Sequence, residues 1–148
     1  SPSNSVVIDW LLQQEERMGL DTIAPYEEFA KRVFEHRDNL TDLVRGLTAD
    51  GKKVLGYGAS TKGNVLLQFC GLTETDLPCI AEVNEEKFGA FTPGTRIPIV
   101  SEEVARDMKP DYFLVLPWHF RDEIIKREID YRHLGGKFIF PLPALVVL

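Results

Sequence analysis

The sequence is poor in cysteine, in basic charge and in long apolar runs, and each shortage argues against a class of protein. Its two cysteines, Cys70 and Cys79, form neither a CxxC pair nor a zinc-ligand pattern, so a reducing cytoplasm is the expected compartment. The net charge of -6 argues against non-specific nucleic-acid binding, which needs a basic face. No apolar stretch approaches the length of a membrane span.

What remains is the composition of an ordinary soluble globular domain. The sequence has 148 residues, enough for one domain to bury a core without disulfides or metals. Its first residue is Ser1 rather than methionine. We therefore expect either a processed product or, in preference, a piece excised from a longer chain.

Residues 1–51 are expected to form two helices. Apolar side chains cluster between Val6 and Leu12 and favour a first helix. From Phe29 to Leu47 apolar residues recur at steps of three, four and seven, which indicates a long amphipathic helix ending near Gly51. This N-terminal helical segment is expected to pack on the domain that follows.

From Lys52 onward, short apolar runs alternate with helical segments. The runs at 53–56, 79–83, 97–100, 112–117 and 137–141 are predicted strands, with helices at 64–70, after Ser101 and at 121–134. Because these strands are apolar almost throughout, we expect helices on both faces of a parallel sheet. The prediction for residues 52–148 is a doubly wound, Rossmann-like α/β domain with a mostly parallel sheet of about five strands. Together with the two leading helices it should form one globular unit.

The glycine-rich stretch GYGASTKGN lies where the first predicted strand gives way to a helix. In a doubly wound sheet, ligands bind beyond the carboxyl ends of the strands, and free N–H groups at a helix start favour an anion. Gly56 is predicted to allow the tight turn, Gly58 the close approach of a ligand, and Gly63 close packing of helix on strand. The predicted substrate- or phosphate-binding residues here are Gly56, Tyr57, Gly58, Ala59, Ser60, Thr61, Lys62, Gly63 and Asn64.

This loop departs from the two most familiar phosphate-binding patterns. A dinucleotide fingerprint GxGxxG would need glycine in place of Thr61, and a P-loop would need its lysine after the last glycine, whereas Lys62 precedes Gly63. Glu82, at the end of the second predicted strand, stands where a dinucleotide-binding domain keeps its ribose-binding acid, so it is a possible ribose contact. NAD stays open as a ligand, and so does a bare strand-to-helix turn with Lys62 in solvent.

Trp118, His119 and Phe120 follow the fourth predicted strand and form a second candidate site on the same sheet edge. Trp118 or Phe120 could stack on a base, and His119 could donate to a phosphate or a sugar hydroxyl. The alternative is that the aromatic rings cover the sheet end or dock another domain, while His119 caps the helix. No nucleophile–base or paired-carboxylate arrangement is assembled, so we predict no catalytic residue and no metal site in this chain.

Four motifs carry a resemblance to a known family. The chain contains, in order, GYGASTKGNVLLQFCG, FTPGTRIPIVS, PDYFLVLPWHFRDEII and YRHLGGKFIFPLP. Their order and spacing resemble the C-terminal domain of the S-adenosylmethionine-dependent sugar C-methyltransferases, which methylate carbon centres of nucleotide-linked deoxysugars. The resemblance covers nearly the whole chain. One departure is Glu82-Val83-Asn84, where many relatives have Asp-Arg-Asn.

The resemblance implies a longer enzyme of deoxysugar biosynthesis with three parts. A zinc-binding N-terminal region and a central methyl-donor domain would precede this Rossmann-like domain, and both are absent here. S-adenosylmethionine and a structural zinc are therefore expected in the missing domains, with no cofactor bound by this fragment. The catalytic residues would also lie there, so the isolated fragment is expected to be inactive.

The resemblance also implies the partners of the chain. They would be a nucleotide-linked sugar and the N-terminal and central domains of the parent chain, with no nucleic acid and no membrane. The glycine loop and residues 117–120 would form part of the wall facing the substrate. Two alternatives stay open, a free-standing NAD- or nucleotide-binding module and a structural docking domain with an empty site.

Overall fold

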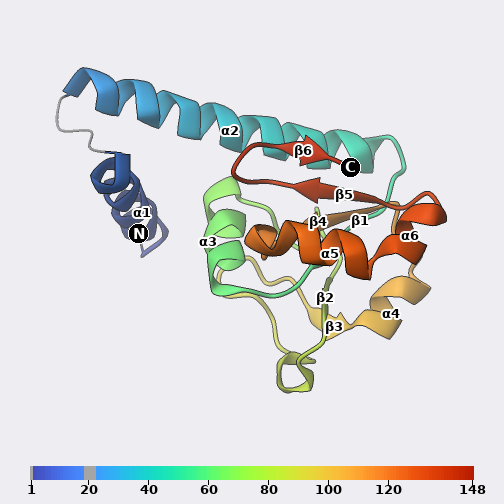
Figure 1. Cartoon of the computed structure of the whole chain (residues 1–148). Helices are drawn as coiled ribbons and strands as arrows, with labels where there is room; N and C mark the ends of the chain where they lie inside the picture. Colours follow the sequence, from blue (N-terminus) through green and yellow to red (C-terminus); the bar gives the residue numbers. More distant parts are fainter. Residues whose placement is uncertain (1, 19–22) are drawn as a thin grey trace.

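The computed structural model describes residues 2–18 and 23–148, and its centre is a six-stranded sheet (Figure 1). The strand order is β3-β2-β1-β4-β5-β6, and every neighbouring pair is parallel except β5 and β6. The predicted α/β class with a mostly parallel sheet is thus confirmed. The strands are β1 (Val54–Tyr57), β2 (Ile80–Glu82), β3 (Ile99–Ser101), β4 (Tyr112–Val115), β5 (Lys137–Phe140) and β6 (Val146–Val147).

The sixth strand was not predicted. β6 is two residues long and pairs antiparallel with β5, so that Val147 lies opposite Ile139 and Val146 opposite Phe140. A two-residue strand carries no periodicity of its own. It becomes a strand only because the chain folds back along the edge that β5 leaves open, where its backbone groups find partners.

Two long helices precede the sheet, as expected, and shorter ones connect its strands. α1 and α2 occupy the N-terminal segment, and α3 follows β1 directly. Ser60 caps α3 by accepting a hydrogen bond from the Gly63 N–H, and Ser101 caps α4 by accepting one from Val104. The helices are α1 (Pro2–Met18), α2 (Ile23–Ala49), α3 (Thr61–Cys70), α4 (Glu102–Asp107), α5 (Arg121–Arg127) and α6 (Ile129–His133), with 3-10 turns η1 (Glu85–Lys87) and η2 (Trp118–Phe120).

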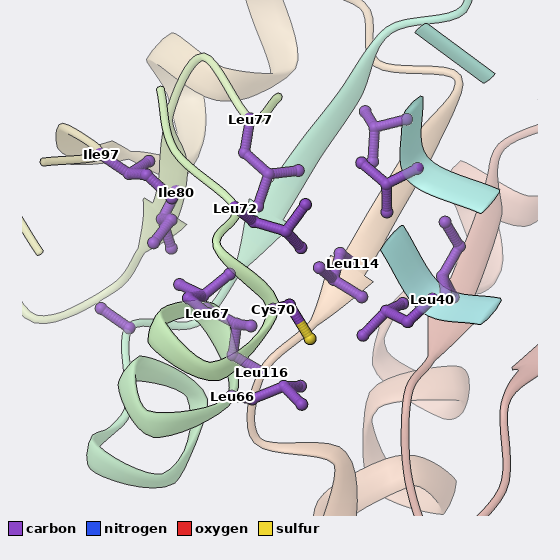
Figure 2. Close-up of a cluster of buried hydrophobic side chains, with 14 of the residues drawn as sticks. Leu40, Leu66, Leu67, Cys70, Leu72, Leu77, Ile80, Ile97, Leu114 and Leu116 are labelled. Atoms are coloured by element: carbon purple, nitrogen blue, oxygen red, sulfur yellow. The ribbon is translucent and has the colours of Figure 1, made fainter. Parts of the chain in front are cut away.

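Two separate cores lie on the two faces of the sheet. Figure 2 shows the first, in which Leu40 of α2 and Leu67 of α3 pack with Leu114 of β4. The second core joins Phe113 of β4 to Ile124 of α5. Successive side chains of a strand point to opposite faces, so each strand must be apolar at nearly every position to supply both cores.

The predicted helix at 121–134 is wrong in one respect, because it breaks at Glu128. α5 ends at Arg127 and α6 begins at Ile129, while Glu128 adopts φ -101° and ψ 26°. Its carboxylate is turned inward, where it is only 4% exposed and accepts hydrogen bonds from Tyr57 and Arg106. Burying that charge against its two partners accounts for the break, since no apolar periodicity predicts it.

Within the described residues, no helix combines the length and the apolar character needed to cross a lipid bilayer.

Candidate functional site

A cavity of about 300 Å³ opens at the carboxyl edge of the sheet, next to the point where the strand order reverses. β1 is flanked by β2 on one side and β4 on the other, so the connections after β1 and β4 leave in opposite directions. Ligands of open α/β sheets favour this kind of crevice. The lining residues are Tyr57, Gly58, Ala59, Ala81, Glu82, Val83, Glu102, Pro117, Phe120, Ile124 and Arg127.

The three glycines of the loop serve different purposes. A Cβ on Gly63 would lie 2.5 Å from the Leu116 Cβ, so its predicted role in packing helix on strand is confirmed. Gly56 lies within β1, where a Cβ would come within 2.6 Å of the Ile80 Cγ1. The turn itself is made by Gly58, whose φ is +77°. The predicted role of Gly56 therefore needs correction, because Gly56 lets the Ile80 side chain approach and Gly58 makes the turn. Gly58 lines the cavity, and the close approach of a ligand to it stays a prediction.

The remaining loop residues divide between the fold and the surface. The Ser60 hydroxyl is engaged in capping α3, and the Ala59 N–H donates to Glu82. Thr61 and Lys62 are exposed at the start of α3, and Lys62 forms no ion pair with any described residue. The Asn64 Oδ1 is buried without a hydrogen-bond partner among the described residues. Lys62 is thus the cation of the loop that is available to a ligand.

Glu82 lies at the cavity wall with its carboxylate largely occupied. Its Oε1 accepts from the Ala59 N–H at 3.2 Å, and its Oε2 accepts from the N–H groups of Val83 at 2.7 Å and Asn84 at 3.2 Å. Lys87 lies 3.6 Å from Oε1 and also donates to the Ala59 carbonyl. Glu82 therefore ties the end of β2 to the glycine loop, and the ribose contact stays a prediction.

The three residues of η2 do not share one environment. Trp118 is half-buried and packs against both cores, so it covers the sheet end. His119 is exposed and contacts the ring of Phe120, and it caps neither η2 nor α5. Phe120 is 50% exposed and lines the cavity. Of the three, Phe120 is the residue that the structure brings beside the glycine loop.

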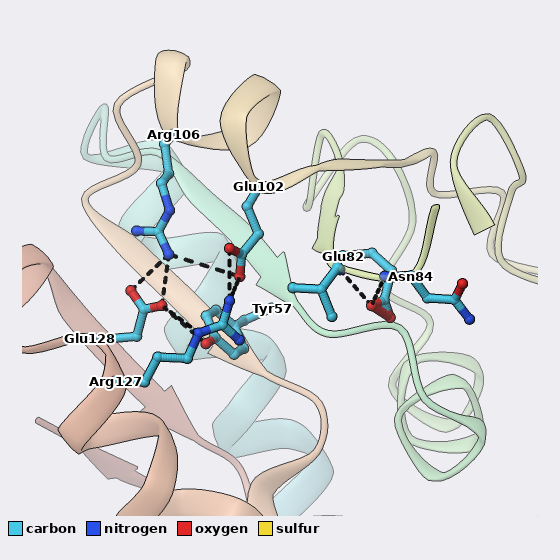
Figure 3. A network of polar contacts seen from close by, with 8 residues as sticks. Tyr57, Glu82, Asn84, Glu102, Arg106, Arg127 and Glu128 are labelled. Atoms are coloured by element: carbon cyan, nitrogen blue, oxygen red, sulfur yellow. Dashed lines mark hydrogen bonds and ion pairs between the residues drawn. The ribbon is translucent and has the colours of Figure 1, made fainter. Parts of the chain in front are cut away.

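A charged network includes Glu102 and Arg127 of the cavity lining and extends beyond the cavity to Arg106 and Glu128 (Figure 3). Arg127 contacts both oxygens of Glu102 at 2.7 and 2.8 Å, and Arg106 contacts both oxygens of Glu128 at the same distances. The Tyr57 hydroxyl donates to Glu128. Burial, and then the negative charge of Glu128, raises the pKa of Tyr57 above its ordinary range, so Tyr57 is a neutral donor.

Sequence reasoning missed the charged residues of this wall. Glu82 is the last residue of β2 and Glu102 is the first residue after β3, and that position at a strand end was a usable signal. Arg127 lies at the end of α5, and nothing local in the sequence marks it. In the described part of the chain, no group of three His, Cys, Asp or Glu side chains is placed to hold a metal ion.

Comparison with known proteins assigns the family. A family model described as the C-methyltransferase C-terminal domain matches residues 1–143. The chain belongs to the C-methyltransferase C-terminal domain family. This confirms the C-methyltransferase resemblance, and the matched residues of this C-methyltransferase C-terminal domain include the whole lining of the cavity.

The chain matches only part of the length of one curated relative. The C-methyltransferase NovU of Streptomyces niveus is 43% identical over 133 residues, which make up 90% of this chain and 32% of the relative. The C-methyltransferase C-terminal domain described above thus spans about a third of the length of that relative.

Proposed function

We propose that the chain is the substrate-side domain of an S-adenosylmethionine-dependent C-methyltransferase that acts on a nucleotide-linked deoxysugar. In this proposal the sheet is a doubly wound, Rossmann-like one, and its crevice helps to bind the sugar nucleotide. The observation that carries the proposal is the cavity between the glycine loop and Phe120, at the reversal of strand order. Its volume of about 300 Å³ is at the lower end for ligand sites and suits one ring of a sugar nucleotide.

The lining of the cavity supports the binding of a ring. Phe120 is half-exposed at its mouth, and Ile124 and Pro117 add apolar surface. Such a surface packs against the face of a base or the C–H groups of a sugar. Arg127 and Glu102 are the polar groups that would orient it.

The diphosphate would lie outside the cavity, at the start of α3. Lys62 is exposed there, and the first N–H groups of a helix, with its dipole, favour an anion. A cation in the first turn is otherwise mildly unfavourable, by about 0.3–1 kcal/mol. A bound phosphate reverses that balance and makes Lys62 a charge-assisted donor.

The rest of the proposed enzyme supplies the chemistry. S-adenosylmethionine, a structural zinc and the catalytic groups belong to the other domains of the parent chain, which would work in the cytoplasm. The length of the NovU relative, of which this chain spans about a third, leaves room for such domains. The isolated chain would then transfer no methyl group.

The test is binding of a nucleoside diphosphate sugar to the full-length enzyme by calorimetry at low salt. Lys62→Ala should weaken binding about tenfold or more, since a charge-assisted hydrogen bond contributes roughly 1.5–3 kcal/mol. Lys52→Ala is the matched control, because Lys52 is equally exposed but precedes β1 at the opposite edge of the sheet. The Lys62 effect should shrink at high salt.

An affinity that Lys62→Ala leaves within twofold would refute the phosphate contact. If Phe120→Ala also left it unchanged, the cavity would not be the binding site. NAD in the same titration tests the free-standing module, which would bind NAD and not the sugar nucleotide.

A further inference from the structure

Glu82 holds a set of hydrogen-bond donors that is typical of a phosphate site. Three backbone N–H groups, those of Ala59, Val83 and Asn84, converge on one carboxylate. The Lys87 ammonium lies beside them. Successive N–H groups at a turn, together with a lysine, are what proteins use to bind an anion from solution. Here the anion belongs to the chain itself.

The Glu82 carboxylate is buried and held in this position by its hydrogen-bond donors. Its side chain is 8% exposed, and a buried carboxylate is tolerated only when its charge is paired and hydrogen-bonded. Lys87 fixes the other end of the contact, since it also donates to the Ala59 carbonyl at 2.8 Å. The backbone of Ala59 is therefore held at both its N–H and its carbonyl.

The occupied position changes which groups the cavity can accept. Among its charged lining residues, Glu82 and Glu102 are negative and Arg127 is positive. Arg127 is already paired with Glu102. A phosphate in the cavity would therefore meet two carboxylates and one engaged cation, with no loop N–H left at Ala59.

A hydroxyl group would meet a better environment. Each carboxylate oxygen accepts about two hydrogen bonds. The Glu82 Oε2 has two N–H partners, while Oε1 has one at hydrogen-bond distance and Lys87 at 3.6 Å. Oε1 can thus accept one more hydrogen from the cavity side, which a sugar hydroxyl supplies and an ionised phosphate does not.

We propose that the Glu82 carboxylate takes the place of a ligand anion on the glycine loop, so that the adjoining cavity selects a hydroxyl-bearing sugar ring and rejects a phosphate. The proposal rests on the proposed function, because it names which part of the sugar nucleotide enters the cavity. The ring is either the ribose or the deoxysugar, which present the same chemistry to Glu82.

The first test is chemical rescue of a variant that lacks the carboxylate. Glu82→Ala leaves the three N–H groups and Lys87 without their anion, and inorganic phosphate should fill the vacancy. At about ten times its dissociation constant, phosphate should raise the folded-to-unfolded ratio of the variant roughly tenfold, which raises Tm by about 3–6 °C for a chain of this size. Ionic strength is held constant with sodium chloride.

Glu85→Ala is the matched control, because Glu85 is an exposed acid three residues away whose side chain holds no loop N–H. In this control and in the wild type, phosphate can bind only at the start of α3, so it should raise their Tm by less than it raises that of Glu82→Ala. An equal effect of phosphate on all three proteins, or none on Glu82→Ala, would overturn the proposal. If Glu82→Ala does not fold alone, the fraction of it that folds when phosphate is added replaces Tm as the measurement, and no recovery by phosphate would overturn the proposal.

The second test reads the site directly by amide NMR of the 148-residue chain. Pyrophosphate should shift the N–H signals of Ala59, Val83 and Asn84 more in the Glu82 variant than in the wild type, where it can bind only at the start of α3. Shifts of the same size in the wild type would contradict an occupied anion position. Both tests use no sugar nucleotide, so their failure is distinct from failure of the proposed function.

The third test asks which ring enters, with the full-length enzyme. A nucleoside and a free deoxyhexose are compared as competitors of the nucleoside diphosphate sugar. If Glu82→Gln weakens competition by the nucleoside or by the deoxyhexose at least fivefold, the cavity selects a ring. The competitor that is weakened identifies which ring enters. The selection of a ring would be refuted if Glu82→Gln changed the competition by neither ring compound and pyrophosphate competed equally well with the wild type and the variant.

Discussion

Replacing Gly63 by alanine sets two opposing effects against each other at the start of α3. A Cβ at this position would lie 2.5 Å from the Leu116 Cβ and 2.9 Å from the Ser60 Oγ. The first atom is attached directly to the backbone after β4, so no side-chain rotation relieves the contact. The second is the hydroxyl that caps α3.

The relative sizes of these effects decide whether Gly63→Ala raises or lowers the free energy of unfolding. Alanine is a better helix former than glycine by about 1 kcal/mol. Forcing a methyl group into a packed contact costs about 1–3 kcal/mol, and disturbing the Ser60 cap adds roughly 0.5–2 kcal/mol. We expect Gly63→Ala to lower the free energy of unfolding by about 1–3 kcal/mol on balance.

Gly46→Ala is the matched control, since Gly46 lies within α2 and a Cβ there meets nothing within 4 Å. Only the helix-propensity gain remains, so this variant should be more stable by about 0.5–1 kcal/mol. Urea unfolding of both variants measures the two shifts at constant m-value. If Gly63→Ala were stabilised as much as Gly46→Ala, α3 would not pack on Leu116, and the shape of the loop would have another cause.

Three further predictions follow from single contacts. Gly58→Ala should lose more stability than Gly89→Ala, by about 1 kcal/mol or more on thermal unfolding. Both have positive φ, but only a Cβ on Gly58 meets the Pro117 ring, at 2.9 Å; equal losses would exclude that contact. Glu128→Ala should lower the free energy of unfolding by about 2–4 kcal/mol in urea because it leaves buried partners unpaired, and Glu128→Gln should cost less since it keeps an acceptor; a loss below about 0.5 kcal/mol would refute the buried network. Burial raises the pKa of the Cys70 thiol from 9.0 to about 11. The stability that this buried neutral thiol contributes to the folded state is therefore fully present below pH 9 and is lost as the pH rises through 11. Between these pH values the free energy of unfolding should fall by roughly 2–3 kcal/mol less in Cys70→Ala than in the wild type. If the free energy of unfolding fell with pH equally in both proteins, the raised pKa of Cys70 would be contradicted.

Much of the fold could be read from local pattern. Strands that are apolar at nearly every position predict a parallel sheet covered on both faces, and the two cores bear this out. The step from strand to glycine loop to helix placed Gly56–Asn64 at the carboxyl edge. The four ordered motifs indicated the family that the comparison confirmed. These features depend on residues close together in the chain.

The side-chain pairs of the charged network could not be predicted from the sequence. Nothing in the sequence predicts that Glu128 would interrupt a helix to reach Tyr57, which precedes it by 71 residues. Nor does it predict that Arg127 would pair with Glu102 across 25 residues. A charge on a helix looks the same in sequence whether it faces water or a carboxylate, because only packing decides its neighbours.

Glu82 shows most clearly which features follow from the sequence and which depend on the tertiary structure. Its place at the end of β2 follows from the sequence, since an acid directly after a buried apolar run must lie at the strand end. Whether its oxygens point to solvent or to backbone N–H groups depends on how closely β2 approaches the glycine loop. That approach requires Gly56 beside Ile80, a contact between β1 and β2. The sequence alone therefore determined where the carboxylate stands, directly before the N–H groups of Val83 and Asn84 that donate to it. Only the tertiary structure decided that it also binds the glycine loop, because Ala59 precedes Glu82 by 23 residues and its N–H reaches the carboxylate only after the chain has folded.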